Sequence, residues 1–284
     1  MTATASTTEQ LAAQFDAFHT ARARTPLVAR LYAAAMGDGY PDEVAPFSSC
    51  DWPLLGLLAS RLRMRPGQLL VDAGCGTGGI GLWLARAQAT SLYGLDVSSV
   101  AIQQAIARSR RFLPAGRAAF RVASLTDTAL SDGCAHGVVC VDALGRTTSR
   151  DDAVRELGRI LAPGARLALT RSLRRDAEPR WEAQAHAAGL IVEHVDERPD
   201  EPAMWERLYR LWIAHAEELR QDLGETQARN MLEEAHRMLP TLPDRRAVLL
   251  TLRRPPTRPA VPDLPDTMVC PGGDAPAPDE RTPQ

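Results

Sequence analysis

The chain has 284 residues, 45% of them hydrophobic, and its 33 basic residues, all arginine, nearly balance 35 acidic residues. This length and hydrophobic content suit one sizeable α/β core with additional helices. The net charge of −2, with arginines scattered along the chain, argues against a nucleic-acid partner. No apolar run approaches the roughly 20 residues that span a bilayer, and the first ten residues lack the pattern of a signal peptide. We therefore expect a cytoplasmic protein without a membrane partner.

Five cysteines, an odd number, show neither a C-x-x-C pair nor the spacing of a zinc site. They lie at positions 50, 75, 134, 140 and 270. We therefore expect a reducing compartment and no bound metal. The sequence does not favour a monomer over a homodimer.

The N-terminal part of the chain is predicted to be helical after a short disordered start at residues 1–9. From 10 to 65, the segments LAAQFDAFHTARA and LVARLYAAAMG repeat apolar residues at helical spacing. Between them and the first strand lies a turn-rich loop, residues 37–55. We interpret 10–65 as a helical segment that lies outside the core and contributes to a lid.

Short apolar strands alternate with amphipathic helices from residue 66 to 200, and a final core strand is predicted within 242–254. Such alternation predicts a doubly wound, Rossmann-like α/β fold with a seven-stranded, mostly parallel sheet. The predicted strands are 68–73, 90–95, 118–122, 137–141, 165–171, 190–196 and 246–253, and the predicted core helices are 78–88, 98–110, 151–161 and 179–188.

The connection between the first strand and its helix, LLVDAGCGTGGIGLWLA over residues 69–85, carries the strongest functional signal. Gly74, Gly76 and Gly78 lack side chains at alternate positions, so a ligand can approach the backbone. Dinucleotide-binding loops are spaced G-x-G-x-x-G and hold a pyrophosphate. Here the third glycine comes earlier, and Asp72 precedes the turn. Because a carboxylate repels pyrophosphate and attracts a cation, the loop predicts a bound nucleoside that carries a positive charge.

The second predicted strand ends in Asp96, about 20 residues after Gly74, which is the spacing of a ribose-binding carboxylate in a βαβ unit. The two carboxylate oxygens of such a residue can accept hydrogen bonds from both ribose hydroxyls. The glycine loop, Asp72 and Asp96 together therefore predict an adenosine site more strongly than the loop alone.

At these residues the chain resembles the class I S-adenosylmethionine-dependent methyltransferases. VDAGCGTG at 71–78 is similar to the first motif of that family, and YGLDVS at 93–98 is similar to the second. ELGRILAPGARLALT at 156–170 is similar to the R-x-L-x-P-G-G phrase, with Ala165 in place of the second glycine. The resemblance covers roughly residues 66–254. It implies S-adenosyl-L-methionine as the cofactor and S-adenosyl-L-homocysteine as the product.

The resemblance also implies roles for individual residues. Asp72 would face the methionine amine, the glycine loop would cradle the cofactor, and Asp96 would bind its ribose. The family usually has an acidic residue for adenine where this chain has Ser124, so its hydroxyl, the Leu125 backbone or Asp127 is the expected substitute. The expected cofactor contacts are Asp72, Gly74, Cys75, Gly76, Gly78, Asp96, Val97, Ser124, Leu125, Asp142 and Tyr40.

Two segments are not needed by a bare nucleoside-binding sheet: the N-terminal helices and an insertion at 201–241. The insertion is predicted to form two helices that are divided near Gly224. We expect both segments to meet as a lid over the carboxyl ends of the strands, where substrate selection must lie because the fold alone does not set it. The proline-rich residues 255–284 are predicted to form a disordered tail.

In the insertion Trp205, Tyr209 and Trp212 share one helix face. This stripe either anchors the helix on the core or lines a pocket for a flat or apolar acceptor. His215 lies near the same face and is a candidate general base. His19, in the first helix, is a second histidine that could enter the pocket.

The loop before the core is similar to a phrase of actinobacterial small-molecule methyltransferases, Y-P-x-E-V-x-P-x-S-x-x-x-W. This similarity implies an acceptor from specialised metabolism, and it places Tyr40 and Trp52 near the methionine end of the cofactor. Asp142 follows the fourth strand and is therefore expected at the cofactor edge of the sheet. It could hold a substrate group, assist proton removal or cap the next turn.

The predicted function is methyl transfer by in-line displacement to O, N or C of a small acceptor, with His215 and Asp142 as candidate catalytic residues. Two alternatives remain open. The protein could bind the cofactor yet catalyse a rearrangement or only bind a ligand, or it could be a nicotinamide-dependent oxidoreductase, against which Asp72 and the early third glycine both argue.

Overall fold

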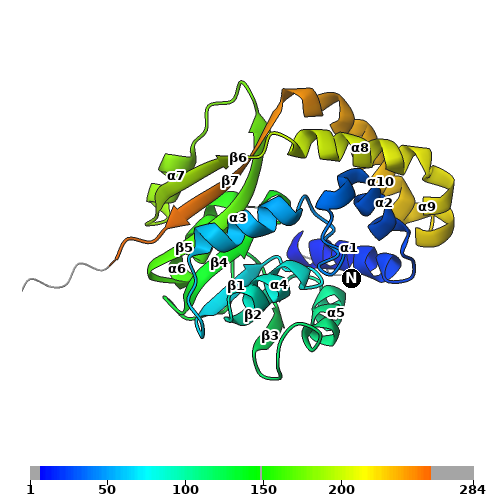
Figure 1. The fold of residues 1–284 in the computed structure, drawn as a ribbon. Coiled ribbons are helices and arrows are strands. Elements are labelled where there is room, and N and C mark those ends of the chain that lie inside the picture. Colours follow the sequence, from blue (N-terminus) through cyan, green and yellow to red (C-terminus); the bar gives the residue numbers. More distant parts are fainter. Residues whose placement is uncertain (1–6, 148, 257–284) are drawn as a thin grey trace, which may run out of the picture.

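A seven-stranded sheet forms the centre of the computed structural model, which describes residues 7–147 and 149–256 (Figure 1). The strand order is β3-β2-β1-β4-β5-β7-β6. β7 is antiparallel to β5 and β6, and the other pairs are parallel, which confirms the predicted mostly parallel sheet. The strands are β1 (Leu69–Ala73), β2 (Ser91–Asp96), β3 (Ala118–Val122), β4 (Ala135–Cys140), β5 (Leu161–Arg174), β6 (Ile191–Glu197) and β7 (Arg245–Arg253).

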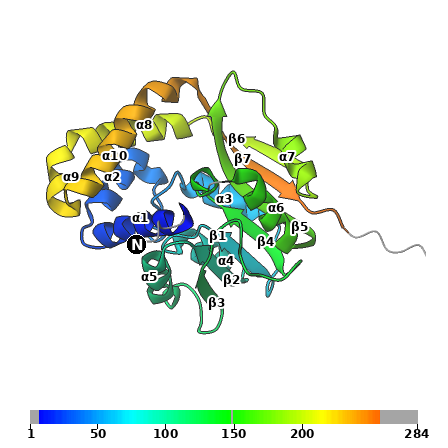
Figure 2. The ribbon, with the colours of Figure 1, turned by 180° about the vertical axis from the view of Figure 1, so that it is seen from behind.

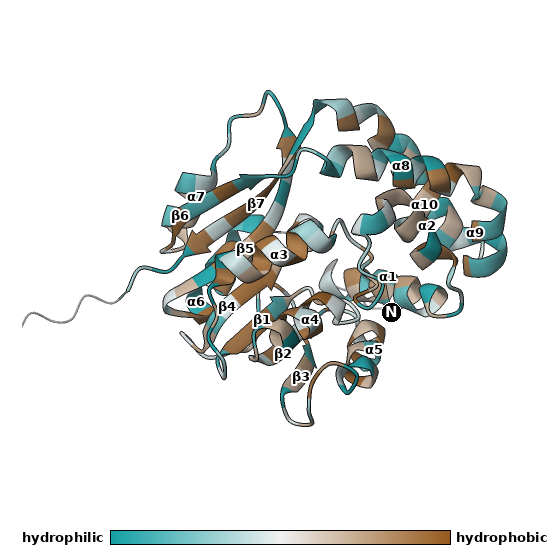
Figure 3. Ribbon diagram, in the orientation of Figure 1, coloured by the Kyte–Doolittle hydropathy of each residue, from teal (hydrophilic) through white to brown (hydrophobic). Residues whose placement is uncertain are grey.

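Helices cover both faces of this sheet (Figures 1 and 2). Successive strand residues point to opposite faces, so Leu70 packs with α3 (Trp52–Leu62) and α4 (Gly79–Ala87), whereas Val71 packs with α6 (Arg150–Ile160) and α7 (Trp181–Ala187). α5 (Ser99–Ser109) packs on β2 and β3. The central strands are accordingly largely hydrophobic (Figure 3).

The remaining helices gather beyond one end of the sheet in both views (Figures 1 and 2). They are α1 (Thr7–Arg22), α2 (Leu27–Met36), η1 (Gly37–Gly39), α8 (Glu201–Ala214), α9 (Ala216–Leu223), α10 (Glu225–Met238) and η3 (Leu239–Asp244); a further short helix, η2 (Leu144–Arg146), follows β4. Leu31 and Tyr32 of α2 share a hydrophobic cluster with Leu208 and Trp212 of α8. The N-terminal helices and the insertion therefore pack together, as predicted for a lid.

Two predicted boundaries are corrected. The insertion contains three α-helices rather than two, because α8 ends at His215, whose backbone N–H and ring Nδ1 both bond to the Leu211 carbonyl. No glycine or proline marks that break. Residues 7–9 form the first turn of α1 rather than disordered chain. Residues 1–6 and 257–284, predicted to be disordered, lie outside the described residues.

The structure places Asp72 beneath α4 and outside the wall of the cavity at the glycine loop, a position that does not favour its predicted contact with the cofactor. Its side chain is almost fully buried between β1 and α4, where Oδ2 accepts a hydrogen bond of 3.0 Å from the backbone N–H of Gly81. A helix N-terminus has unpaired N–H groups, and one carboxylate can satisfy such a donor. Asp72 therefore anchors the first turn of α4 to β1. Burial raises the pKa of this carboxyl to about 7, against the opposing effect of the Gly81 bond.

The raised pKa of Asp72 predicts a pH-dependent contribution to stability. In the unfolded chain the carboxyl ionises near its usual value, whereas in the folded protein it stays protonated to about pH 7. Its contribution is therefore fully present at low pH and is lost as the pH rises to about 7. In urea unfolding, Asp72→Asn should gain stability relative to wild type as the pH is raised from 5 to 8. Parallel pH profiles for the two proteins would contradict this account.

The start of α4 packs closely against the loop before the core. A Cβ added at Gly79 would lie 2.1 Å from the Val44 carbonyl oxygen, whereas one at Gly56, in the middle of α3, meets no atom within 4 Å. Gly79→Ala should therefore cost about 1–3 kcal/mol of unfolding free energy through forced backbone movement. Gly56→Ala is the matched control and should gain roughly 0.5–1 kcal/mol from helix propensity. Equal stability of the two variants in urea unfolding would show that this contact does not constrain the loop.

Candidate functional site

The glycine loop leaves β1 with a backbone that side chains would obstruct. Gly74 has φ of 78°, and a Cβ there would lie 2.3 Å from the Cβ of Ala143, so this glycine allows the loop to pass the chain that follows β4. Gly76 has φ of 51°, and the nearest atom to an added Cβ is His19 Cε1 at 3.8 Å. The backbone at Gly76 therefore borders open space.

Asp96 fixes that open loop at the end of β2. Its Oδ2 accepts a hydrogen bond of 2.8 Å from the Gly76 N–H, and its Oδ1 accepts one of 2.9 Å from the Ser98 N–H. Burial raises the pKa of the carboxyl, and the backbone donors oppose that shift. Each oxygen keeps further lone-pair capacity, so the carboxylate can also accept bonds from a ligand.

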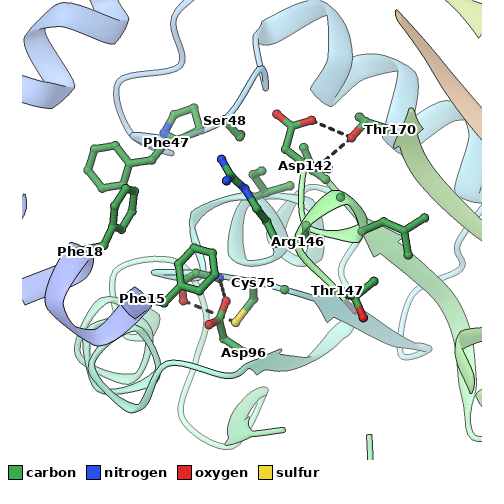
Figure 4. Close-up of a pocket in the computed structure, with 18 of the residues that line it drawn as sticks. Phe15, Phe18, Phe47, Ser48, Cys75, Asp96, Asp142, Arg146, Thr147 and Thr170 are labelled. Carbon is green, nitrogen blue, oxygen red and sulfur yellow. Dashed lines mark hydrogen bonds between the residues drawn. The ribbon is translucent and has the colours of Figure 1, made fainter. Parts of the chain in front are cut away.

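A cavity of about 430 Å³ begins at this loop and extends beneath the lid (Figure 4). Twelve of the residues predicted for cofactor or acceptor lie in its wall: His19, Gly74, Cys75, Gly76, Asp96, Val97, Ser124, Leu125, Asp142, Trp205, Tyr209 and Trp212. Residues from the core loops and from the helical lid thus share one space. Asp127 lies outside this wall, and its N–H donates to the Ser124 hydroxyl over 3.0 Å.

Three other predicted site residues lie elsewhere. Gly78 packs under the loop, where an added Cβ would meet Ala105 at 3.0 Å. The ring of Tyr40 is buried among the lid helices, and burial raises the pKa of its hydroxyl to about 12. Trp52 lies on the exterior in edge contact with Trp83. Helical and loop spacing could not distinguish these positions from cavity positions.

His215 is also misplaced by the prediction. It ends α8 outside the main cavity, beside Leu27, Arg30 and Glu218, and its ring bonds to the Leu211 carbonyl. The physical reason is that His215 lies one helical turn after Leu211 and shares its side of the helix, which faces Leu27 and Arg30 rather than the cavity. It is therefore not a base for chemistry in this cavity.

Asp142 lies in the wall of the cavity in a backbone conformation with φ of 53°. Its Oδ2 accepts from the Ser49 N–H at 2.6 Å, and its Oδ1 accepts from the Thr170 hydroxyl at 2.8 Å (Figure 4). Asp142 thus connects the end of β4 to β5 and to the loop before α3. The prediction that Asp142 lies at the edge of the sheet agrees with the structure. Both of its carboxylate oxygens already accept hydrogen bonds from neighbouring segments of the protein.

Glu201, at the start of α8, was missed by the sequence analysis. It is a buried carboxyl in the cavity wall, paired with Arg198, and its Oε1 accepts from Trp205 Nε1 at 3.3 Å. Burial and the charge of Asp142 raise its pKa to about 7, while Arg198 acts in the opposite direction. The sequence signal that could have identified Glu201 was its place one helical turn before Trp205.

Arg22, Phe18 and Phe47 were missed as well. They line the cavity, where the rings of Phe18 and Phe47 lie across from Asp142 at the end of β4 (Figure 4), and both rings contact the guanidinium of Arg22. His19 lies one turn before Arg22, and burial together with the charge of Arg22 lowers its pKa to about 4. His19 is therefore neutral at physiological pH. The sequence signal was an arginine on the apolar face of a helix.

Within 7–147 and 149–256, no group of three or more His, Cys, Asp or Glu side chains could hold a metal ion. In the same residues no helix has the length and apolar character needed to cross a membrane.

Comparison with protein families and characterised sequences identifies the core. Residues 70–164 match the family described as "Methyltransferase domain". An O-methyltransferase of Aspergillus sclerotiorum is 30% identical over 112 residues, which cover 39% of this chain and 42% of that protein. The 27-O-demethylrifamycin SV methyltransferase of Amycolatopsis mediterranei is 28% identical over 164 residues, 57% of this chain and 58% of that protein. The chain therefore spans about half the length of the curated relatives it matches.

Solved structures share the fold over most of the chain. The [4+2]-cyclase SpnF superposes with a TM-score of 0.69 at 24% identity, covering 89% of this chain and 97% of the other. Geranyl diphosphate C-methyltransferase from Streptomyces coelicolor gives a TM-score of 0.57 at 18% identity, with 89% and 100% covered. Residues 70–164 thus match a methyltransferase domain, and most of the chain has the fold of these two solved proteins.

Proposed function

We propose that the protein transfers a methyl group from S-adenosyl-L-methionine to O, N or C of a small acceptor held beneath the helical lid. One observation carries this proposal: the same cavity extends from Gly76 and Asp96 to Trp205 and Trp212 of the lid. A cavity of about 430 Å³ is large enough for small molecules and is lined by both aromatic and polar groups. Matches to O-methyltransferases and to a rifamycin methyltransferase support an acceptor from specialised metabolism.

The residues at the loop end of the cavity fit S-adenosylmethionine by their chemistry. An unobstructed backbone at Gly76 admits a ligand, and Asp96 offers carboxylate oxygens suited to ribose hydroxyls. Cys75 and Val97 border the same space, and Ser124 with Leu125 would lie against adenine. Bound there, the cofactor would supply an electrophilic methyl group on a sulfonium, and S-adenosyl-L-homocysteine would be the product.

The protein would contribute mainly by positioning the acceptor. Alignment of two reactants within a dry site supplies on the order of 7–11 kcal/mol, whereas a general base adds roughly 10²- to 10⁴-fold. The lid helices and their aromatic side chains would exclude water and orient the acceptor. Asp142 would position the chain at the end of β4, and Glu201 would receive a proton when the acceptor atom must lose one.

The cofactor assignment predicts direct binding. Calorimetry should detect one site for S-adenosylmethionine and for S-adenosylhomocysteine, followed by a gain of one methyl on an acceptor in mass analysis. Asp96→Asn should weaken cofactor binding by about tenfold or more, equivalent to about 1.4 kcal/mol, because the ribose loses a carboxylate partner. Asp127→Asn, an exposed site outside the cavity, is the matched control. Wild-type protein without affinity for either compound would refute the proposal.

The role of Glu201 predicts a split between binding and rate. Once an acceptor is known, Glu201→Gln should lower kcat by roughly 10²- to 10⁴-fold and leave cofactor affinity within about twofold, since the amide keeps its size but cannot take the proton. The wild-type rate should rise with pH through about 7, where the carboxyl ionises, and the variant should lack that rise. A variant with wild-type kcat and pH profile would assign Glu201 a structural role only.

A second candidate function is a rearrangement without methyl transfer. It is favoured by the structural likeness to a [4+2]-cyclase, at a TM-score of 0.69. Retained S-adenosylmethionine together with conversion of a substrate into an isomer of equal mass would support it. Production of S-adenosylhomocysteine in step with a methylated product would exclude it. The matched family and relatives are named for methyl transfer, and this supports neither a nicotinamide cofactor nor hydride transfer.

A further inference from the structure

Arg22 is a buried cation in the acceptor end of the cavity. It is the last residue of α1, is 6% exposed and forms part of the cavity wall. Its guanidinium carbon lies 3.6 Å from the ring centroid of Phe18 and 4.7 Å from that of Phe47. These cation–π contacts offset part of the cost of burial. They do not satisfy the N–H groups of Nε and Nη1, which have no acceptor among the described residues.

Part of the hydrogen-bonding capacity of Arg22 is unused in the part of the chain that the structure describes. Its Nε and Nη1 have no partner there, and its hydrogen-bonding neighbour is Tyr32, which carries no charge at neutral pH. Burial lowers its pKa to about 10, so the side chain remains a cation at neutral pH. A buried charge without a hydrogen-bonding counterion is costly, and it is stabilised when a ligand supplies an anion.

The acidic groups nearby are committed to other partners. Glu234 accepts from Arg146 and from the Tyr209 hydroxyl, both at 3.2 Å. Glu201 pairs with Arg198. Trp212 Nε1, another N–H donor of the cavity wall, has no partner among the described residues. Arg22 and Trp212 therefore carry unused N–H donors at the lid end of the cavity, and such donors suit a ligand oxygen.

The neighbours of Arg22 place it at the acceptor end of the cavity rather than at the cofactor end. The charged groups that act on its pKa are Glu234 of α10 and Arg146, which follows β4. Tyr32, its polar neighbour, contacts the rings of Phe47, Trp205 and Trp212. All of these residues except Arg146 belong to the lid segments, whereas the predicted ribose contact, Asp96, lies at the end of β2.

We infer that the acceptor carries an acidic oxygen group, a carboxylate or a phenolate, on a planar apolar frame, and that Arg22 binds this group between Phe18 and Phe47. The inference rests on the proposed function for its acceptor. The anion pairs with guanidinium N–H groups that have no other partner, and the frame lies against the lid aromatics Trp205 and Trp212. Arg22 is thus a specificity-determining residue that selects anionic acceptors over neutral ones.

The test uses 1-naphthoate and its neutral analogue 1-naphthamide as probes on the full chain loaded with S-adenosylhomocysteine. Binding is followed by calorimetry and by tryptophan emission, since Trp205 and Trp212 border the cavity. The wild type should bind naphthoate about tenfold or more tightly than naphthamide, because a charge-assisted bond to arginine is strong. Arg22→Met should abolish that preference, and Arg22→Lys should retain part of it. Arg24→Met, at an exposed position two residues away, is the matched control and should keep it.

Equal or tighter binding of naphthamide by the wild type would overturn the inference, as would a preference that survives in Arg22→Met. A second arm compares S-adenosylhomocysteine with 5′-methylthioadenosine, which lacks the amino-acid carboxylate. If Arg22→Met weakens only the former, Arg22 binds the cofactor carboxylate and the inference fails. A wild type that does not bind S-adenosylhomocysteine contradicts the proposed function instead. The naphthoate titration of cofactor-free protein then still tests Arg22.

Discussion

The site depends on the bidentate use of the Asp96 carboxylate, which joins the ends of the first two strands. One oxygen holds the N–H of Gly76 and the other holds the N–H of Ser98, so the glycine loop is fixed where it borders the cavity. The Ser98 hydroxyl in turn donates to Asp16 of α1 over 2.6 Å. The same junction that shapes the loop therefore ties down the first lid helix.

A second set of polar contacts joins the other side of the lid to the sheet. Asp142 holds the Ser49 N–H, and Arg198 donates to the Ser49 carbonyl at 2.6 Å and pairs with Glu201 at the start of α8. The end of β4, the loop before α3 and the insertion are thus linked through Ser49. Because these groups are buried and charged, their partners define the geometry of the cavity more strictly than apolar packing alone. Both sets of polar contacts attach the lid to the core at the cavity.

Much of the fold could be predicted because its signals are local. Strand alternation, the glycine loop and Asp96 each follow from spacing along a few residues, and the seven strands lie where apolar runs were found. Asp72 could not be placed, because a carboxylate beside the loop suits either a ligand or the start of α4, and only packing against Gly81 decides. His215 and Trp52 failed for a related reason: helical spacing gives a face but not the neighbour of that face. Arg22 was missed because a single arginine on an apolar helix reveals neither its burial nor its lack of a partner.

The most direct test of this account is a crystal structure of the protein grown with S-adenosylhomocysteine. The account predicts that the ribose hydroxyls lie on the Asp96 carboxylate, that the backbone of Gly76 borders the ligand and that the sulfur faces the space between Asp142 and the lid. Asp72 should remain bonded to the Gly81 N–H beneath α4. A ligand bound elsewhere, or one in this cavity whose ribose makes no contact with Asp96, would contradict it.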